Sequence, residues 1–323
     1  MSQDPVVVVG AGVSGLSCAI RLIEMGMAVR VVAAHPTEQT TSAAAGAMWY
    51  PYLAAPQHLV LGWAQTTRIA LDKLAAEDPA TGVRRQRFIE FHEGLVADPW
   101  WAPAVPGLRY ARPDELRTGF GHGWVFEVPM VRTPVYLGWL QQRLAELGGT
   151  IELLDQPLDR LPEATVVVNC GGWEAGRLAG DDATVIPTSG QVVVVANPGV
   201  EVGLMVEHGP GAPLYIIPRG EDCVLGGTAN PSVLPGTPPD DEVTAQIIDK
   251  CARLEPALRD AAVLDVKIGF RPVRERVRVE SVTRDDGSTV VHNYGHGGAG
   301  YTLSWGCAEA AASLVEEAIT RRG

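Results

Sequence analysis

Residues 6–22 read VVVVGAGVSGLSCAIRL, and this stretch decides the fold. Four β-branched valines favour a strand, and the apolar residues after the glycines recur at helical spacing. Between them lies the pattern G-x-G-x-x-G, which in a strand–turn–helix setting binds the pyrophosphate of a dinucleotide. Gly10 permits the tight turn, Gly12 lets a phosphate approach the backbone, and Gly15 lets the helix pack closely on the strand. The N–H groups that begin the helix would then face the phosphates.

The second strand, expected at residues 27–32, completes a βαβ unit but lacks one part of the dinucleotide fingerprint. An acid is expected at the end of this strand, where it binds the ribose hydroxyls. Residues 32–35 read VAAH and contain no carboxylate. Two alternatives remain for the ribose, namely Glu38 or His35 together with backbone groups. The motif alone does not separate FAD from NAD.

Composition narrows the class of protein. The 323-residue chain is 46% hydrophobic and 20% charged, as expected of a soluble globular protein with one large or two modest domains. Its net charge of −12 argues against nucleic acid and anionic membrane surfaces as partners. Five scattered cysteines without a C-x-x-C pair predict neither a disulfide framework nor a metal site, and they fit a reducing cytoplasm. No apolar run approaches the ~18 residues of a membrane span.

Strand–glycine–helix units stand at both ends of the chain, with different material between them. A small-residue run, TTSAAAGA at 40–47, indicates a neighbour as bulky as a cofactor. Residues 83–132 mix short strands with Pro/Trp loops, and residues 188–226 alternate strands with Gly/Pro turns, as antiparallel sheets do. The expected fold is α/β plus α+β, a discontinuous Rossmann-like FAD-binding domain with an inserted antiparallel-sheet substrate domain. The boundaries are 1–52, 135–187 and 264–323 for the first, and 53–134 and 188–263 for the second.

Short motifs in a fixed order cover nearly the whole chain. The most specific is HNYGHGG at 292–298, followed by GFRPVR at 269–274. The others lie at residues 8–17, 44–46, 51–53, 168–170, 215–218, 225–227 and 305–306. With these motifs the sequence resembles the D-amino-acid oxidases, FAD enzymes of the glutathione-reductase-like superfamily.

The resemblance implies an oxidative deamination. A D-amino acid loses a hydride from Cα to FAD, the imino acid hydrolyses to a 2-oxo acid and ammonia, and dioxygen reoxidises the flavin to give hydrogen peroxide. In the family, the arginine matching Arg271 pairs with the substrate carboxylate, which suits its planar fork. The tyrosine matching Tyr215 adds a hydroxyl to the same carboxylate. The glycine matching Gly298 offers its carbonyl to the substrate amine.

The residues expected to contact FAD come from the two glycine turns, the end of the second strand, the small-residue run and one buried strand. They are Gly10, Gly12, Val13, Ser14, Gly15, Ala34, His35, Thr41, Ser42, Gly46, Ala47, Val168, Gly297, Gly298, Ala299, Gly300, Tyr301 and Thr302. No metal ligand is expected.

Departures from the family pattern bear on the substrate. Residues 207–213 lack the lid tyrosine that many relatives carry just before Tyr215, so we expect a short lid or none. Ala229 stands in the segment where D-aspartate oxidases typically add an arginine, which disfavours an acidic substrate, with Arg219 left as the exception. Neutral, largely apolar D-amino acids are therefore expected.

Alternatives remain open at this point. A glycine or sarcosine oxidase would share the fold and the carboxylate-binding arginine, and a D-aspartate oxidase would resemble the chain closely. A non-catalytic FAD protein and an NAD-dependent dehydrogenase are more distant alternatives. The expected partners are a D-amino acid and dioxygen, with no nucleic acid and no membrane. A homodimer is left open, and the expected location is the cytoplasm.

Overall fold

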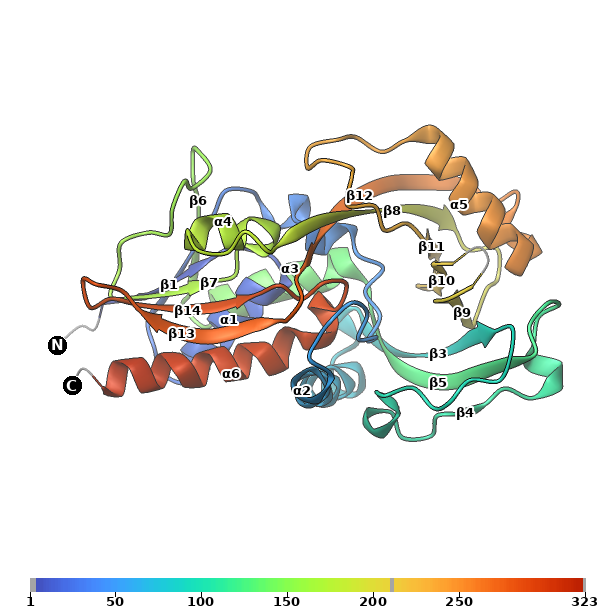
Figure 1. Ribbon diagram of the computed structural model, residues 1–323, viewed down its shortest axis with the longest axis horizontal. Coiled ribbons are helices and arrows are strands. Elements are labelled where there is room, and N and C mark those ends of the chain that lie inside the picture. Colours follow the sequence, from blue (N-terminus) through green and yellow to red (C-terminus); the bar gives the residue numbers. More distant parts are fainter. Residues whose placement is uncertain (1–3, 210–211, 322–323) are drawn as a thin grey trace.

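The computed structural model describes residues 4–209 and 212–321 and contains two sheets (Figure 1). Sheet A is six-stranded with the order β13-β14-β7-β1-β2-β6. Its strands are parallel from β14 to β6, and β13 pairs antiparallel with β14 at one edge. The bounds are Val6–Val9 for β1, Val29–Ala33 for β2, Thr150–Leu153 for β6, Val166–Asn169 for β7, Arg278–Thr283 for β13 and Thr289–Tyr294 for β14. The glycine turn after β1 therefore lies at the carboxyl edge of a parallel sheet.

Sheet B is eight-stranded with the order β12-β8-β11-β10-β9-β3-β5-β4. It is antiparallel apart from the parallel pairing of β3 with β9. The bounds are Val83–His92 for β3, Arg109–Tyr110 for β4, His122–Val131 for β5, Ile186–Ala196 for β8, Gly203–Val206 for β9, Leu214–Pro218 for β10, Asp222–Gly226 for β11 and Val263–Val273 for β12. Figure 1 shows that the sheet curves from β12 and β8 round to β3 and β5. One face of sheet B is therefore concave, and it is called the hollow face below.

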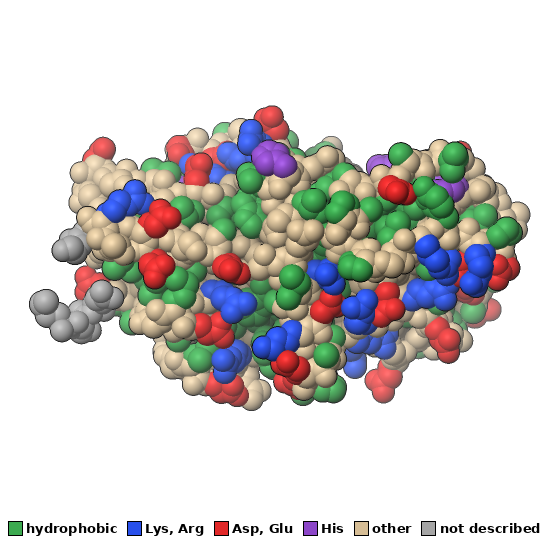
Figure 2. Space-filling model, turned by 90° about the horizontal axis from the view of Figure 1, so that it is seen from below, with side chains coloured by type: hydrophobic (Ala, Val, Ile, Leu, Met, Phe, Trp, Pro, Cys, Tyr) green, Lys and Arg blue, Asp and Glu red, His purple; other side chains and the backbone are tan. Residues whose placement is uncertain are grey.

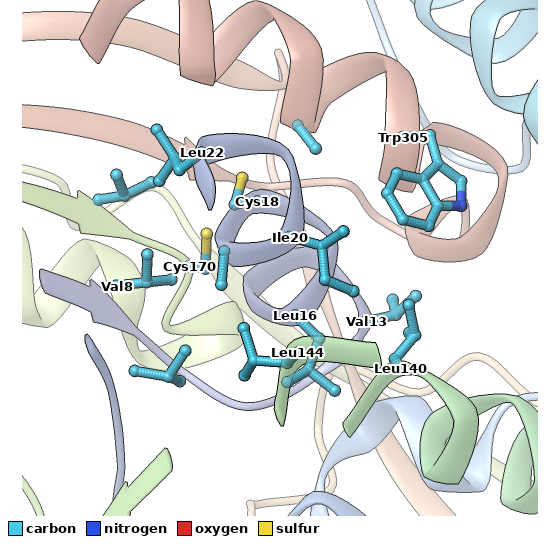
Figure 3. Close-up of a cluster of buried hydrophobic side chains, with 14 of the residues drawn as sticks. Val8, Val13, Leu16, Cys18, Ile20, Leu22, Leu140, Leu144, Cys170 and Trp305 are labelled. Carbon is cyan, nitrogen blue, oxygen red and sulfur yellow. The ribbon is translucent and has the colours of Figure 1, made fainter. Parts of the chain in front are cut away.

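Three helices pack on one another beside sheet A and form its main core. They are α1 (Val13–Glu24), α3 (Thr133–Glu146) and α6 (Gly300–Thr320). Figure 3 shows Leu16 and Ile20 of α1 between Leu144 of α3 and Trp305 of α6. Burial of such side chains contributes ~1.5–3 kcal/mol each. This packing holds the N-terminus of α1 beside the end of β1, where the glycine turn lies.

Close helix packing also joins α6 to α2 (Gln57–Glu77). A Cβ on Gly306 of α6 would lie 2.1 Å from the carbonyl oxygen of Trp63, so a larger residue does not fit there. The Gly306 N–H donates a hydrogen bond of 2.9 Å to the Thr67 hydroxyl. Helix α5 (Asp241–Leu254) covers the outer side of sheet B, and the short α4 (Ala175–Ala179) follows β7.

The surface carries both signs of charge. In Figure 2, which views the molecule from below, acidic and basic side chains are interspersed rather than gathered into one patch. Ion pairs such as Arg85–Glu127 at 2.7 Å account for part of this mixing. Within residues 4–209 and 212–321, none of the helices combines the length and apolar character that crossing a bilayer requires.

The fold class expected from the sequence is confirmed, since a largely parallel sheet and a largely antiparallel sheet are both present. The sequence also predicts helices at 58–74, 135–147 and 239–251, and their ends lie within three residues of the ends of α2, α3 and α5. The domain boundaries stay a prediction, and one strand departs from them. The boundary at 264 assigns β12 to the FAD-binding domain, but β12 pairs with β8 in sheet B from Val263 to Val273.

A buried acid ties the edge of sheet A to the segment after α4. Asp182 accepts hydrogen bonds from the Tyr294 hydroxyl at 2.9 Å, Arg274 Nε at 2.8 Å and the Thr184 N–H at 3.0 Å. Burial opposes ionisation of this carboxyl, but the hydrogen bonds from Thr184, Tyr294 and Arg274 outweigh it and hold its pKa well below the usual range. The ionised form is therefore the stable one in the folded protein.

Asp182→Asn is expected to lower the free energy of unfolding of the holoenzyme by about 3 kcal/mol at pH 7, because it leaves a partly buried arginine without its counter-ion. The pKa is depressed on folding, so the stabilisation is complete above the unfolded-state pKa of about 4 and declines as the pH falls. Urea unfolding should show that the difference in the free energy of unfolding between the wild type and this variant is smaller at pH 3 than at pH 7 by roughly 1 kcal/mol. Exposed Asp155→Asn is the control. If the wild type and the variant differed in stability by the same amount at both pH values, the depressed pKa of Asp182 would be contradicted.

Candidate functional site

A cavity of about 610 Å³ opens between the two sheets. It begins at the carboxyl ends of β1 and β2 and reaches the hollow face of sheet B, where β8, β9, β10 and β12 line it. Ligand sites in open α/β sheets lie at such carboxyl ends, and the volume lies within the ~300–1,000 Å³ typical of ligand pockets. One end is therefore suited to a nucleotide and the other to a small substrate.

The glycine turn has the geometry that the sequence predicts. Gly10 has φ +105°, and a Cβ there would lie 2.5 Å from the carbonyl oxygen of Cys170. A Cβ on Gly15 would lie 1.8 Å from the Gly10 carbonyl oxygen, so only glycine lets α1 sit this close to the turn. Both residues shape the turn, and Gly10 also lines the cavity.

The N-terminus of α1 is suited to an anion. Gly12 is its N-cap and supplies no side-chain cap, and the first turn contains no acidic residue. The Val13 N–H donates to the Ser42 hydroxyl at 3.0 Å, which brings the small-residue run to the helix end. The helix dipole and the N–H groups thus meet a cavity wall without a carboxylate. The pyrophosphate of FAD fits this end of the cavity.

Most of the residues expected to contact the cofactor line one continuous cavity. These are Gly10, Gly12, Val13, Ser14, Ala34, His35, Thr41, Ser42, Gly46, Ala47, Gly297, Gly298, Gly300 and Tyr301. Segments more than 250 residues apart are thereby brought together. For example, the Tyr301 hydroxyl donates to the Ser42 carbonyl oxygen at 2.9 Å.

Four of the expected residues do not line the cavity. Gly15 packs α1 on the turn, and Val168 is buried at the centre of β7 in the core of sheet A. Ala299 is the N-cap of α6 and is fully buried. The Thr302 hydroxyl donates to the Tyr50 carbonyl oxygen and accepts the Tyr50 N–H, at 2.9 and 3.0 Å. Thr302 therefore positions the loop around Tyr50, and its expected contact with the cofactor stays a prediction.

The ribose region contains residues that sequence reasoning missed. Glu38 does not line the cavity, whereas its neighbour Gln39 does. Glu174 lines it from the segment after β7 and forms an ion pair with Arg177 at 3.2 Å. The position of Glu174 just beyond a buried strand was the available signal, because strand carboxyl ends converge at such sites. Together with His35, these residues are the polar groups that could hold the ribose.

Arg271 of β12 reaches the substrate end of the cavity. Its Nη1 donates to the carbonyl oxygens of Thr228 at 2.9 Å and Ser189 at 3.2 Å. A Cβ on Gly190 would lie 2.3 Å from the guanidinium nitrogens, so the arginine lies directly over this glycine. A guanidinium has five N–H donors, and anchoring by Nη1 leaves a fork edge for a carboxylate.

Two tyrosine hydroxyls accompany Arg271. Tyr215 extends over Gly226, where a Cβ would come within 2.0 Å of its ring. Burial raises the pKa of both Tyr215 and Tyr52, and the nearby Arg271 lowers each by a smaller amount. Both hydroxyls therefore stay protonated at neutral pH and can donate hydrogen bonds to a carboxylate beside the arginine.

Tyr52 was not predicted as a site residue, although it belongs to the PYL motif that helped to mark the resemblance. Its carbonyl oxygen accepts the Gly298 N–H at 3.1 Å. A Cβ on Gly298 would lie 2.4 Å from Tyr52 Cδ1, so the second glycine turn and Tyr52 touch. Tyr52 thus adds a second tyrosine hydroxyl to the cavity that Tyr215 and Arg271 line.

The remaining substrate-related expectations have mixed outcomes. Arg219, the suggested exception for an acidic substrate, is buried and pairs with Asp222 at 2.7 Å, outside the cavity lining. It is wrong as a candidate because its guanidinium closes the β10–β11 turn. The proposed short lid at 207–213 includes residues 210–211, which lie outside the described residues, so it stays a prediction.

Comparison with known proteins agrees with this geometry. Residues 5–314 match the family described as FAD dependent oxidoreductase. A D-amino-acid oxidase of Rubrobacter xylanophilus is 48% identical over 317 residues, covering 97% of this chain and 96% of the relative. A D-amino-acid oxidase of Streptomyces coelicolor is 43% identical, covering 96% of each chain. Human D-aspartate oxidase is 34% identical, covering 99% of this chain and 96% of the relative.

Solved structures support the fold. Glycine oxidase from Bacillus cereus superposes with a TM-score of 0.80 at 20% identity, covering 98% of this chain and 95% of the other. At that identity the similarity concerns the fold alone. The full-length family match and the identities above confirm the resemblance found in the sequence, and with it FAD as the cofactor. The chain belongs to the D-amino-acid oxidase family of FAD-dependent oxidoreductases.

Proposed function

We propose that this protein is a D-amino-acid oxidase that converts D-amino acids to 2-oxo acids, ammonia and hydrogen peroxide. The observation that carries the proposal is the group formed by Arg271, Tyr215 and Tyr52. It lines the same cavity as the Gly297–Gly298 turn, and that cavity runs on to the dinucleotide end. A carboxylate anchor beside a cofactor cavity is what oxidation at Cα of an amino acid requires.

The residues at the nucleotide end fit FAD. When bound, FAD accepts the two electrons of the oxidation and passes them to dioxygen. Gly10, Gly12 and the first turn of α1 would hold its pyrophosphate, and Gly297 and Gly300 would lie against its ring system. The start of α6 at Gly300 turns a second helix N-terminus toward the cavity, which favours negative charge there.

The role of Arg271 is to fix the substrate. Its fork binds a carboxylate at two points, which sets the orientation as well as the position. The Tyr215 and Tyr52 hydroxyls donate further hydrogen bonds. The Gly298 carbonyl accepts a hydrogen bond from the substrate amine. With the carboxylate and the amine anchored and the side chain directed along the cavity, one direction is left for the Cα hydrogen. Phe270, Pro272 and Ile217 keep the walls apolar and exclude water.

Tyr215→Phe and Tyr52→Phe are each expected to lower kcat/KM by about 2- to 13-fold, because a single hydrogen bond from a hydroxyl contributes ~0.5–1.5 kcal/mol. Steady-state peroxide production with one D-amino acid measures the effect. Tyr110→Phe, on the exposed edge strand β4, is the matched control and should leave the rate unchanged. A Tyr52→Phe variant with wild-type kcat/KM would remove Tyr52 from the substrate contacts.

The test of the proposed function is an anaerobic absorbance titration of the purified yellow protein. D-Alanine, D-valine and D-norleucine should bleach the flavin band, and the L-enantiomers should not. Admission of dioxygen should restore the band and release peroxide. Activity confined to glycine and sarcosine would support the amine-oxidase alternative instead. Bleaching by none of these compounds, and by neither D-lysine nor D-arginine, would refute oxidation of amino acids.

The finer partner and location assignments are part of this proposal. Dioxygen is the proposed electron acceptor and the cytoplasm is the proposed location, whereas the homodimer is one of the assemblies left open. Size-exclusion chromatography with light scattering tests the assembly. A rate of reoxidation that rises with dioxygen concentration tests the acceptor.

A further inference from the structure

A carboxylate lines the cavity on the side of sheet B that lies across from Arg271. Glu207 directly follows β9, and its side chain retains 21% of its exposure. Met205 pairs with Tyr215 of β10, so Glu207, two residues further on, shares the face that carries the Tyr215 ring. The cavity therefore has a cation at one end of its sheet B face and an acid at the other.

The separation of these two groups suits a long substrate side chain. Strands β12 and β9 are four steps apart in sheet B, which corresponds to roughly 19 Å along the curved backbone. The Arg271 side chain extends inward over Gly190. The distance from its guanidinium to Glu207 is therefore shorter than the distance between the two strand backbones. Met48, Met205 and Ile217 line the cavity with apolar groups. Several methylene groups, ending in a polar tip, fit such a passage.

Two buried groups hold the negative charge on Glu207. The Tyr50 hydroxyl contacts both Glu207 and Glu90, the latter at 3.1 Å. A hydroxyl has one proton to donate, so one of the two carboxyls must contribute its own. Burial, with the nearby Glu207, raises the pKa of Glu90 to about 8. The buried Glu90 is thus the neutral acid, and the Tyr50 hydroxyl donates to the cavity-facing Glu207 carboxylate.

The basic side chains near Glu207 do little to balance its negative charge. Within the described residues, no lysine or arginine forms an ion pair with Glu207, and the exposed His208 lies 3.9 Å away. Behind Glu90, the His92 ring nitrogen lies 3.5 Å from the carboxyl, and burial lowers the pKa of His92 to about 4, so the ring is neutral. A half-buried carboxylate without a counter-ion is unfavourable unless a ligand supplies the cation.

On the basis of the proposed function, we propose that Glu207 is a specificity-determining residue that selects D-amino acids whose side chain ends in a cation, such as D-lysine and D-arginine. The substrate carboxylate pairs with Arg271, the methylene groups pack on the apolar wall, and the terminal cation pairs with Glu207. This proposal differs from the sequence-based expectation of neutral, largely apolar D-amino acids. The apolar wall suits the methylene groups, and Glu207 adds a preference for a positive charge at their end. An acidic side chain would meet repulsion from Glu207 instead.

The experiment compares matched substrates that differ in charge. Values of kcat/KM are measured for D-lysine against D-norleucine and for D-arginine against D-citrulline, with the wild type, Glu207→Gln and Glu201→Gln. Glu201 is an exposed acid just before β9 and is the matched control. The wild type should prefer the cationic member of each pair by at least about tenfold, equivalent to ~1.4 kcal/mol. Glu207→Gln should remove that preference and change D-norleucine turnover less than about threefold.

Each outcome decides one of the claims. Loss of the charge preference in Glu207→Gln with retention in Glu201→Gln supports the proposal. A uniform loss for all four substrates would show a structural role and overturn it. An unchanged preference in Glu207→Gln, or no preference in the wild type, would overturn the charge selection and leave D-amino-acid oxidation standing. A wild-type enzyme that oxidises none of the four but oxidises D-alanine would overturn the inference alone, and one that oxidises none of these five would refute the proposed function as well.

Discussion

Arg271→Ala is expected to lower kcat/KM for D-amino acids by roughly 100- to 5,000-fold, because the substrate carboxylate would enter a desolvated site without its partner. The free-energy loss corresponds to ~3–5 kcal/mol. Both tyrosine hydroxyls remain in the variant, but neutral donors do not replace a bidentate ion pair. Steady-state peroxide kinetics over a wide substrate range measures the change, and the flavin spectrum verifies that the cofactor is still bound.

Two further variants sharpen this test. Arg271→Lys keeps the charge but loses the fork, so it should recover only part of the activity. Arg276→Ala removes an exposed arginine from the same stretch and should behave as the wild type. If Arg271→Ala kept more than half of the wild-type kcat/KM, the carboxylate would have to bind elsewhere, and the proposed orientation of Cα would fall with it.

Gly12→Val is expected to abolish FAD binding. Gly12 has φ −79°, so valine can adopt this backbone conformation and the apoprotein should fold. The added side chain, however, would begin 3.0 Å from Ser42 Oγ and would occupy the approach to the N–H groups of α1. The purified variant should be colourless, and titration with FAD should show affinity weaker by at least about 10²-fold, as expected when a pyrophosphate loses its N–H cradle.

The control for this prediction is the same substitution at an open position. A Cβ on Gly62 of α2 would meet nothing within 4 Å, so Gly62→Val should stay yellow. Gly10→Val is a poor alternative, because its φ of +105° and the Cys170 carbonyl at 2.5 Å would disturb the fold itself. A yellow Gly12→Val protein with normal FAD affinity would place the pyrophosphate away from α1.

Local sequence determined much of the fold. The valine strand, the glycine turn and α1 are contiguous, and each residue choice there agrees with the same structure. Local sequence does not determine which of the two sheets β12 joins. Nothing in residues 263–273 states whether the strand adds to sheet A or to sheet B, because pairing partners far apart in sequence decide it. For this reason the sequence-based boundary at 264 assigned the segment to the FAD-binding domain.

The candidate site shows the same division. Arg271 and Tyr215 follow from motifs, whereas Tyr52 and Glu207 gain meaning only when loops from distant segments meet around the cavity. Val168 illustrates the opposite case. Its strand ends beside the cavity, but Val167 and Val168 are both fully buried, on opposite faces of sheet A, so the expected contact of Val168 with the cofactor stays a prediction. The position of a strand can be predicted from the sequence, but the direction in which one of its side chains points is much harder to predict.

Gly190 and Gly226 form the floor of the substrate region, and this has a consequence for engineering. A methyl group at either position would collide with the Arg271 guanidinium or the Tyr215 ring. Laboratory evolution toward new substrates therefore has little freedom beneath the carboxylate anchor. Productive mutations should accumulate on the opposite rim, around the turn that follows β9, where side chains can be exchanged without moving the anchor.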